Sequence, residues 1–124
     1  MIKSLALSAL TLLLVSCAPI TKVTTNLDAE NFRHYFAPSQ VTIYERIADL
    51  PTQHKLIGLV EGDNCQEKPH HAIPDKLQAR TMARRNAFEQ GANAIVFSSC
   101  VEIQTKACHA NIVCYGQAYQ VASE

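Results

Sequence analysis

Residues Ala92–Val121, ANAIVFSSCVEIQTKACHANIVCYGQAYQV, decide the fold. Two apolar runs rich in β-branched residues, Ala92–Ile103 and Ile112–Val121, flank the polar segment QTKACHAN, and such runs are typical of β-strands. The first run begins almost continuously apolar, which predicts a strand in the middle of a sheet. We therefore predict a β-hairpin whose turn is centred near residue 107.

The cysteines in and near this hairpin predict two disulfides. In a hairpin with that centre Cys100 faces Cys114, and directly opposed residues lie about 4.5–5.5 Å apart, within disulfide range. The turn then carries Cys108 at its tip, free to reach the segment around Cys65. Of the three possible pairings, Cys65–Cys108 with Cys100–Cys114 distorts the backbone least. Oxidation during synthesis would instead favour the sequential pairing, Cys65–Cys100 with Cys108–Cys114.

Two further strands are predicted before the hairpin. VTIY, residues Val41–Tyr44, is a β-branched and aromatic run. ERIADLP follows as a short helical turn closed by Pro51. HKLIGLVEGD, residues His54–Asp63, forms the second strand, and we expect a Gly-Asp-Asn turn to end it just before Cys65.

A helix is predicted from about Pro74 to Gln90. Pro74 suits the first helical position, the carboxylate of Asp75 complements the helix dipole, and Gly91 suits a left-handed C-terminal cap. One side of this helix carries small or uncharged side chains, which allow close packing on a sheet: Ala79, Met82, Ala83, Asn86, Ala87 and Gln90.

Another side of this helix is a candidate partner surface. Arg80 and Arg84 lie together there, flanked by Leu77, Thr81 and Phe88. A mixture of basic and apolar side chains fits a docking surface. The alternative is a solvated helix face whose apolar members touch a neighbouring loop.

Together these segments predict the class α+β: a small β-β-α-β-β domain, a four-stranded sheet with helical cover, stapled by two disulfides. The domain is assigned to residues 41–124, and one domain suits a chain of this size. A domain this small buries a modest share of its surface, so covalent cross-links add stability that it needs. The charges balance, with 11 Lys+Arg and 11 Asp+Glu, which argues against a nucleic-acid-binding domain.

Residues 1–16 are predicted to be a lipoprotein signal peptide. A charged start precedes eleven mostly apolar residues, Leu5–Val15, whereas a membrane-spanning helix takes roughly 20. Leu14-Val15-Ser16-Cys17 resembles a lipobox, in which the cysteine becomes the lipidated N-terminus; an ordinary secretion signal is the alternative. Two or more acyl chains on Cys17 would anchor the protein stably. An acidic residue after the cysteine would favour inner-membrane retention, and because Ala18 stands there we expect the outer membrane.

Residues 17–40 are expected to be the lipidated Cys17 and a tether. Near its end, LDAENFRHYF places Phe32, Tyr35 and Phe36 at helical spacing. We expect either a short helix that folds back on the domain or an apolar patch for a partner.

Metal binding and catalysis have little support in the sequence. Two cysteines and three histidines include both side-chain types that bind zinc: Cys65, Cys108, His70, His71 and His109. Neither CxxC nor HxxxH spacing occurs, however, and an oxidising compartment removes free thiolates. A thiol–disulfide exchange enzyme would use a close pair such as CxxC. We therefore expect no enzymatic activity, no metal and no cofactor, apart from the covalent lipid on Cys17.

Several segments taken together resemble the RcsF family of outer-membrane lipoproteins. In order and spacing, the similarity is carried by VTIYERIADL, GLVEGDNCQ, the IP before the helix, ANAIVFSSC and CHANIVCYGQA. It covers about Val41 to Ala118, and all four domain cysteines fall at matching places. The preceding lipobox agrees with it.

The resemblance implies a stress sensor. Members of the family report envelope damage to the Rcs phosphorelay, which controls capsule and envelope genes, by relieving inhibition by the inner-membrane regulator IgaA. They engage outer-membrane β-barrel proteins, notably BamA and OmpA-like porins. The family fold is a small α/β domain, and its non-consecutive disulfides, carried over here, would be Cys65–Cys108 and Cys100–Cys114.

The tether departs from the family pattern. The family segment is longer, basic and rich in proline and is thought to thread through a barrel, whereas residues 17–40 contain two prolines and an aromatic cluster. We expect a domain that faces the periplasm. The alternative function is a small envelope lipoprotein with a structural or metal-handling role.

Overall fold

The computed structural model describes residues 29–122. Its elements in chain order are α2 (Ala29–Phe36), the 3₁₀ helix η2 (Ala37–Gln40), β1 (Thr42–Tyr44), the 3₁₀ helix η3 (Ile47–Asp49), β2 (His54–Gln66), α3 (Lys76–Glu89), β3 (Ala94–Ile103) and β4 (Ala110–Val121). The predicted signal peptide, Cys17 and the first part of the tether lie outside the described residues. No helix within residues 29–122 is long and apolar enough to cross a membrane.

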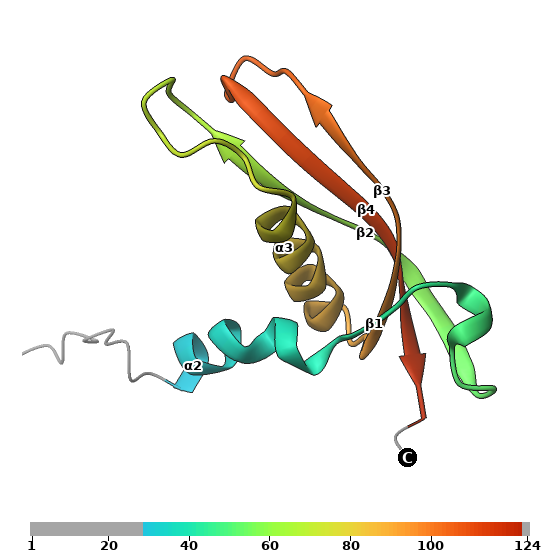
Figure 1. Ribbon diagram of the computed structural model, residues 1–124. Coiled ribbons are helices and arrows are strands. Elements are labelled where there is room, and N and C mark those ends of the chain that lie inside the picture. The colour runs from blue at the N-terminus through green and yellow to red at the C-terminus, as the bar shows by residue number, and fades with distance from the viewer. Residues whose placement is uncertain (1–28, 123–124) are drawn as a thin grey trace, which may run out of the picture.

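The four strands form one mixed sheet in the order β1-β3-β4-β2. β3 pairs antiparallel with β4, β4 pairs antiparallel with β2, and β1 pairs parallel with the start of β3, at Ala94–Val96. Helix α3 lies on one face of the sheet (Figure 1). The predicted α+β class is confirmed, and β3 is central, as predicted, over its apolar start at Ala94–Val96.

The β3–β4 hairpin has the register expected from the sequence. Cys100 faces Cys114, and Val101 faces Val113. A β-bulge between Phe97 and Ser99 inserts one extra residue, Ser98, whose hydroxyl donates to the Tyr115 carbonyl at 3.2 Å. The bulge shifts the pairing by one residue in the lower half of the hairpin, where Ile95 faces Ala118.

Two predicted boundaries were wrong. No turn ends β2 at residues 62–64, because β4 begins at Ala110 and its backbone pairs with β2 as far as Gln66. The helix begins at Lys76 rather than at Pro74, because Asp75 is its N-cap. The Asp75 carboxylate accepts from the Leu77 amide at 3.0 Å.

The core between α3 and the sheet depends on small residues. Ala79, Ala83 and Ala87 are fully buried on the helix side that faces the sheet. They let α3 approach so closely that a Cβ built on Gly62 of β2 would lie 2.1 Å from the Ala83 nitrogen and 2.3 Å from the Ala79 oxygen. The three alanines of the predicted packing side thus pack as the sequence predicts, whereas Met82 and Asn86 are only partly buried and Gln90 is exposed just after the helix. Gly91, with φ +87°, ends the helix in the left-handed conformation.

The sheet face turned away from α3 is covered in its lower half by the loop that contains η3. Leu50 packs there with four residues of β3 and β4, and Tyr44 borders them. The four are Ala94, Val96, Tyr119 and Val121. The upper half of this face carries no helix (Figure 1).

Part of the segment expected to be a tether belongs to the folded unit. Ala37 and Pro38 of η2 are buried, and α2 touches the end of α3 through the Arg85 guanidinium, which donates to the His34 carbonyl at 3.3 Å. Phe32 and Tyr35 remain exposed on α2. The segment therefore has both expected properties, since it is a helix that contacts the domain and it presents aromatic side chains to solvent.

Replacing Gly62 with alanine should destabilise the domain by about 3 kcal/mol or more, because the new methyl group would overlap the backbone of α3. Gly58→Ala is the matched control, since the nearest atom to its added Cβ is Gln90 Oε1 at 3.6 Å. That variant should be neutral or stabilised by up to about 1 kcal/mol. Urea denaturation with the disulfides intact would measure both, and equal stability of the two variants would contradict the close approach.

Candidate functional site

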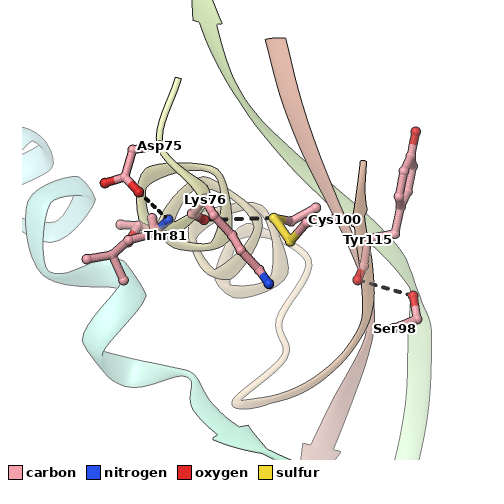
Figure 2. The surroundings of a disulfide bond; sticks show 8 residues. Asp75, Lys76, Thr81, Ser98, Cys100 and Tyr115 are labelled. Carbon is pink, nitrogen blue, oxygen red and sulfur yellow. Dashed lines mark hydrogen bonds between the residues drawn. A yellow bond between two sulfur atoms is a disulfide. The ribbon is translucent and has the colours of Figure 1, made fainter. Parts of the chain in front are cut away.

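Two disulfides brace the end of the sheet at which α3 begins. Cys100 and Cys114 are joined across β3 and β4, with their Cα atoms 4.0 Å apart. Cys114 is fully buried, and its sulfur lies 3.8 Å from the Lys76 carbonyl oxygen in the first turn of α3 (Figure 2). The bridge therefore fixes the hairpin directly beneath the start of the helix.

The second disulfide, Cys65–Cys108, joins the end of β2 to the β3–β4 turn, with a Cα–Cα distance of 5.5 Å. The Cys108 amide donates to the Thr105 hydroxyl at 3.1 Å, and the neighbouring His109 amide donates to the Gln66 carbonyl at 2.6 Å. Both bridges have the pairing expected from the sequence. Neither belongs to the sequential alternative.

The loop between β2 and α3 is held by two polar side chains that the sequence analysis did not single out, the buried Gln66 and the partly exposed Asn64. Gln66 is 6% exposed, and its amide donates to the carbonyls of Pro69 and His71 at 3.1 and 2.9 Å. The Asn64 side chain accepts from the Asp75 amide at 2.8 Å. Polar residues just after an apolar strand are the signal that could have identified them, because buried backbone groups in a loop need such partners.

The candidate metal ligands do not form a site. Cys65 and Cys108 are bonded to each other, and the rings of His70 and His71 contact one another on an exposed loop. Within residues 29–122 no group of three or more His, Cys, Asp or Glu side chains is arranged to hold a metal ion.

The structure divides the candidate partner surface on α3. Leu77 is 66% exposed, whereas Phe88 is partly buried against the core. Arg84 is half-buried, and its Nε and Nη2 donate to the Val41 carbonyl at 3.0 and 2.7 Å. Burial, and to a lesser degree the positive charge of Arg80, lower the pKa of Arg84 below its usual value. Arg84 is thus engaged in joining α3 to the start of β1.

Arg80 has a different environment. Its guanidinium lies over the Phe97 ring, 4.3 Å from the ring centre. No acceptor bonds its buried Nε within the part of the chain that the structure describes. A small hollow of about 170 Å³ lies beside it, lined by Lys76, Arg80, Phe97, Ser98, Ser99 and Cys100.

The upper half of the open sheet face is a second exposed surface, which sequence reasoning missed. We define the open face by Leu59, Val101, Ile103 and Tyr115, which alternate with residues that face α3 and remain partly or largely exposed. The alternation of apolar side chains at Val101 and Ile103 and at Val113 and Tyr115 is the signal that could have shown it.

A comparison with known protein families finds a matching family. The model of a family described as RcsF lipoprotein matches residues 17–122, and this match starts at the cysteine of the predicted lipobox. A search of curated proteins finds no match.

Removing either disulfide should lower the free energy of unfolding, by an amount that increases with the length of the loop that the disulfide closes. The chain-entropy model gives about 4 kcal/mol for Cys65–Cys108 and about 3 kcal/mol for Cys100–Cys114, since their sequence separations are 43 and 14. Paired Cys→Ala variants in urea denaturation would test this. Peptide mapping without reduction should link Cys65 to Cys108 and Cys100 to Cys114, and a Cys108–Cys114 peptide in folded protein would overturn the register.

Replacing Arg84 with methionine should destabilise the domain by about 1–2 kcal/mol, because the two charge-assisted hydrogen bonds to Val41 are lost while the aliphatic stem is retained. Gln78→Met, an exposed position on the same helix, is the control and should be near neutral. Equal stability of the two variants would show that Arg84 is dispensable for packing and available to a partner.

Proposed function

The chain belongs to the RcsF lipoprotein family, and we propose that it senses envelope stress at the outer membrane and activates the Rcs phosphorelay by relieving inhibition by IgaA. The observation that carries this proposal is the family match over residues 17–122, which includes both the predicted lipidation site and the disulfide-braced domain. The family itself consists of envelope lipoproteins related to the Rcs system.

Anchoring at the outer membrane is the first part of the proposal. Cys17 carries the acyl chains, which hold the protein in the membrane while the domain remains in the periplasm. Ala18 directs the protein away from retention in the inner membrane. Residues 19–28 then connect the anchor to α2, and the exposed aromatic side chains of α2 lie on the part of the chain that is nearest to the membrane in sequence.

Contact with partners is the second part. The proposed partners are a β-barrel protein such as BamA or an OmpA-like porin in the outer membrane, and IgaA in the inner membrane. Within the candidate partner surface of α3, Leu77 and Arg80 are better suited to an intermolecular contact than Arg84 and Phe88, which have partners within the domain. Two disulfides around this end of the fold keep the surface rigid, so little conformational entropy is lost on docking.

Ala18→Asp should move the protein to the inner membrane and raise Rcs output without external stress, because the sensor would then lie beside its regulator. The measurement is an Rcs-dependent reporter, with membrane fractionation, in a strain that lacks its chromosomal sensor. Ala18→Ser is the control, which should keep the location and output of the original chain.

Cys17→Ala should abolish acylation and leave the protein released or unprocessed. Incorporation of an acyl label into that variant would refute the lipidation site. A lipoprotein with a structural or metal-handling role predicts a different result, namely that reporter output does not respond when the chain is restored to the strain. If Ala18→Asp changes the membrane and not the output, the signalling role is wrong even though the anchor is right.

A further inference from the structure

The upper part of β3 is an unpaired sheet edge. β1 pairs with β3 at Ala94–Val96, whereas β3 continues to Ile103. Figure 1 shows β1 beside the lower part of β3 and the upper part extending beyond it. Among residues 29–122, no other strand pairs with the outer side of β3, so the position in line with β1 beside Phe97–Ile103 is vacant.

The hydrogen-bonding pattern shows which backbone groups face this vacancy. The Tyr115 carbonyl points toward β3, because the Ser98 hydroxyl donates to it. The backbone N–H and C=O groups of alternate residues point to opposite neighbouring strands, so those of Cys114 point toward β2. Cys100 and Cys114 are therefore a non-hydrogen-bonded pair of the β3–β4 ladder. Its Cα separation of 4.0 Å agrees with that class. The N–H and C=O groups of Cys100 and, by the same alternation, of Glu102 therefore point to the open edge.

A row of positive charge runs beside this edge. Lys76, Arg80 and Arg84 are spaced four residues apart on α3, so they lie along one side of the helix. Among the described residues, neither Lys76 nor Arg80 has an acidic partner within ion-pair distance. Both line the hollow against Phe97–Cys100, and Figure 2 shows the Lys76 side chain together with the disulfide and the bulge at Ser98. A ligand strand would meet uncompensated positive charge at this place.

The opposite edge of the sheet is less suited to a ligand. On β2 the Glu61 carbonyl already accepts from the Asn86 amide at 2.7 Å, and the side chains of Glu61 and Asp63 are exposed. The ladder of β2 is also interrupted between Leu56 and Gly58. Beside Phe97–Cys100 the neighbouring charged side chains are the basic Lys76 and Arg80, with Glu102 two residues further along β3, whereas Glu61 and Asp63 of β2 are acidic. The two edges also differ in the availability of their backbone groups.

We propose that the upper edge of β3, with Lys76 and Arg80 of α3, binds an extended acidic segment of a partner protein as an added strand in line with β1. Backbone hydrogen bonds to Cys100 and Glu102 would hold the strand, and a carboxylate of the segment would enter the hollow and bind Arg80 and Lys76. The inference rests on the proposed function only for the role of this contact in signalling, since binding itself is measured on purified protein.

The test uses the full acylated protein in detergent micelles and a blocked octapeptide, TEVETEVT, as the probe. At about 1 mM peptide, hydrogen exchange at the Cys100 and Glu102 amides should slow several-fold, while exchange along the β2 edge should not change. The same peptide with lysine in place of each glutamate should give no protection. Two further acidic peptides carry N-methyl groups on alternate amides, one on the odd and one on the even positions, so that each has one edge unable to donate hydrogen bonds. Only the peptide whose blocked edge would face β3 should fail to protect the Cys100 and Glu102 amides.

Variants then separate the charge from the fold. Arg80→Gln and Lys76→Gln should each weaken peptide binding by about 3–10-fold, as expected for loss of a partly exposed ion pair. Arg80→Lys should retain most of the affinity, and Lys55→Gln on β2 is the control that should leave it unchanged. Thermal melting identifies any variant that fails to fold. If Arg80→Gln does not fold, the affinities of Arg80→Lys and Lys76→Gln decide whether these charges bind the peptide.

Three outcomes would overturn the proposal. The first is unchanged exchange at Cys100 and Glu102 with the acidic peptide, and the second is equal binding of the lysine peptide. The third is protection that appears without peptide as the protein concentration is raised, together with a doubled mass, because the edge would then pair with a second copy of the chain. Loss of reporter output with intact peptide binding, by contrast, would count against the proposed function alone.

Discussion

The placement of Cys100 opposite Cys114 is the constraint on which the rest of the sheet depends. It sets the register of the β3–β4 hairpin, and this register puts Cys108 in the turn, where it can bond to Cys65. The bond to Cys65 holds β2 against β4 to its last residue, Gln66. A one-residue slip of the hairpin would move every side chain of β4 to the other face and separate both cysteine pairs. Two covalent bonds and one register therefore specify each other.

The disulfide-braced end of the sheet also lies beside basic side chains of α3, and these differ in how far they are engaged within the domain. Because Gly62 and the alanines of α3 bring the helix close to β2 and β4, the basic side of the helix is left above the outer part of β3. Arg84 uses its charge within the domain, on the Val41 carbonyl. Arg80, one turn earlier, has an aromatic ring below it and no acidic partner in the described part of the chain. One helix side thus serves stability at its C-terminal half and exposes charge at its N-terminal half.

Local patterns in the sequence were sufficient for most of the fold. Apolar runs predicted the strands, the alanines predicted the face of α3 that packs, and symmetry about the turn predicted the disulfides. One error, the start of α3, is local, because Asp75 is the N-cap of the helix. The other errors concern contacts between distant segments. The Gly-Asp-Asn motif after Glu61 is typical of a turn, yet pairing with β4 outweighs that preference. The parallel pairing of β1 with β3 and the bond from Arg84 to Val41 join residues more than 40 positions apart, and no local period encodes them. The bulge at Ser98 was missed for the same reason, since it depends on how two strands meet.

The disulfide connectivity also constrains how the domain reaches its native state. Cys108 and Cys114 are near neighbours in sequence, so their thiols collide often in an unfolded chain, but each is bonded to a more distant residue in the fold. Cys65 finds Cys108 when β2 has paired with β4, because this pairing brings the end of β2 to the hairpin turn. Oxidation that precedes strand pairing would favour the wrong bonds, and these can be corrected through mixed disulfides with an attacking thiolate. Strand pairing therefore selects the native bonds, and the bonds then hold the strands in that register. In an envelope protein that folds in an oxidising compartment, this order makes the amount of native protein depend on disulfide isomerisation as well as on oxidation.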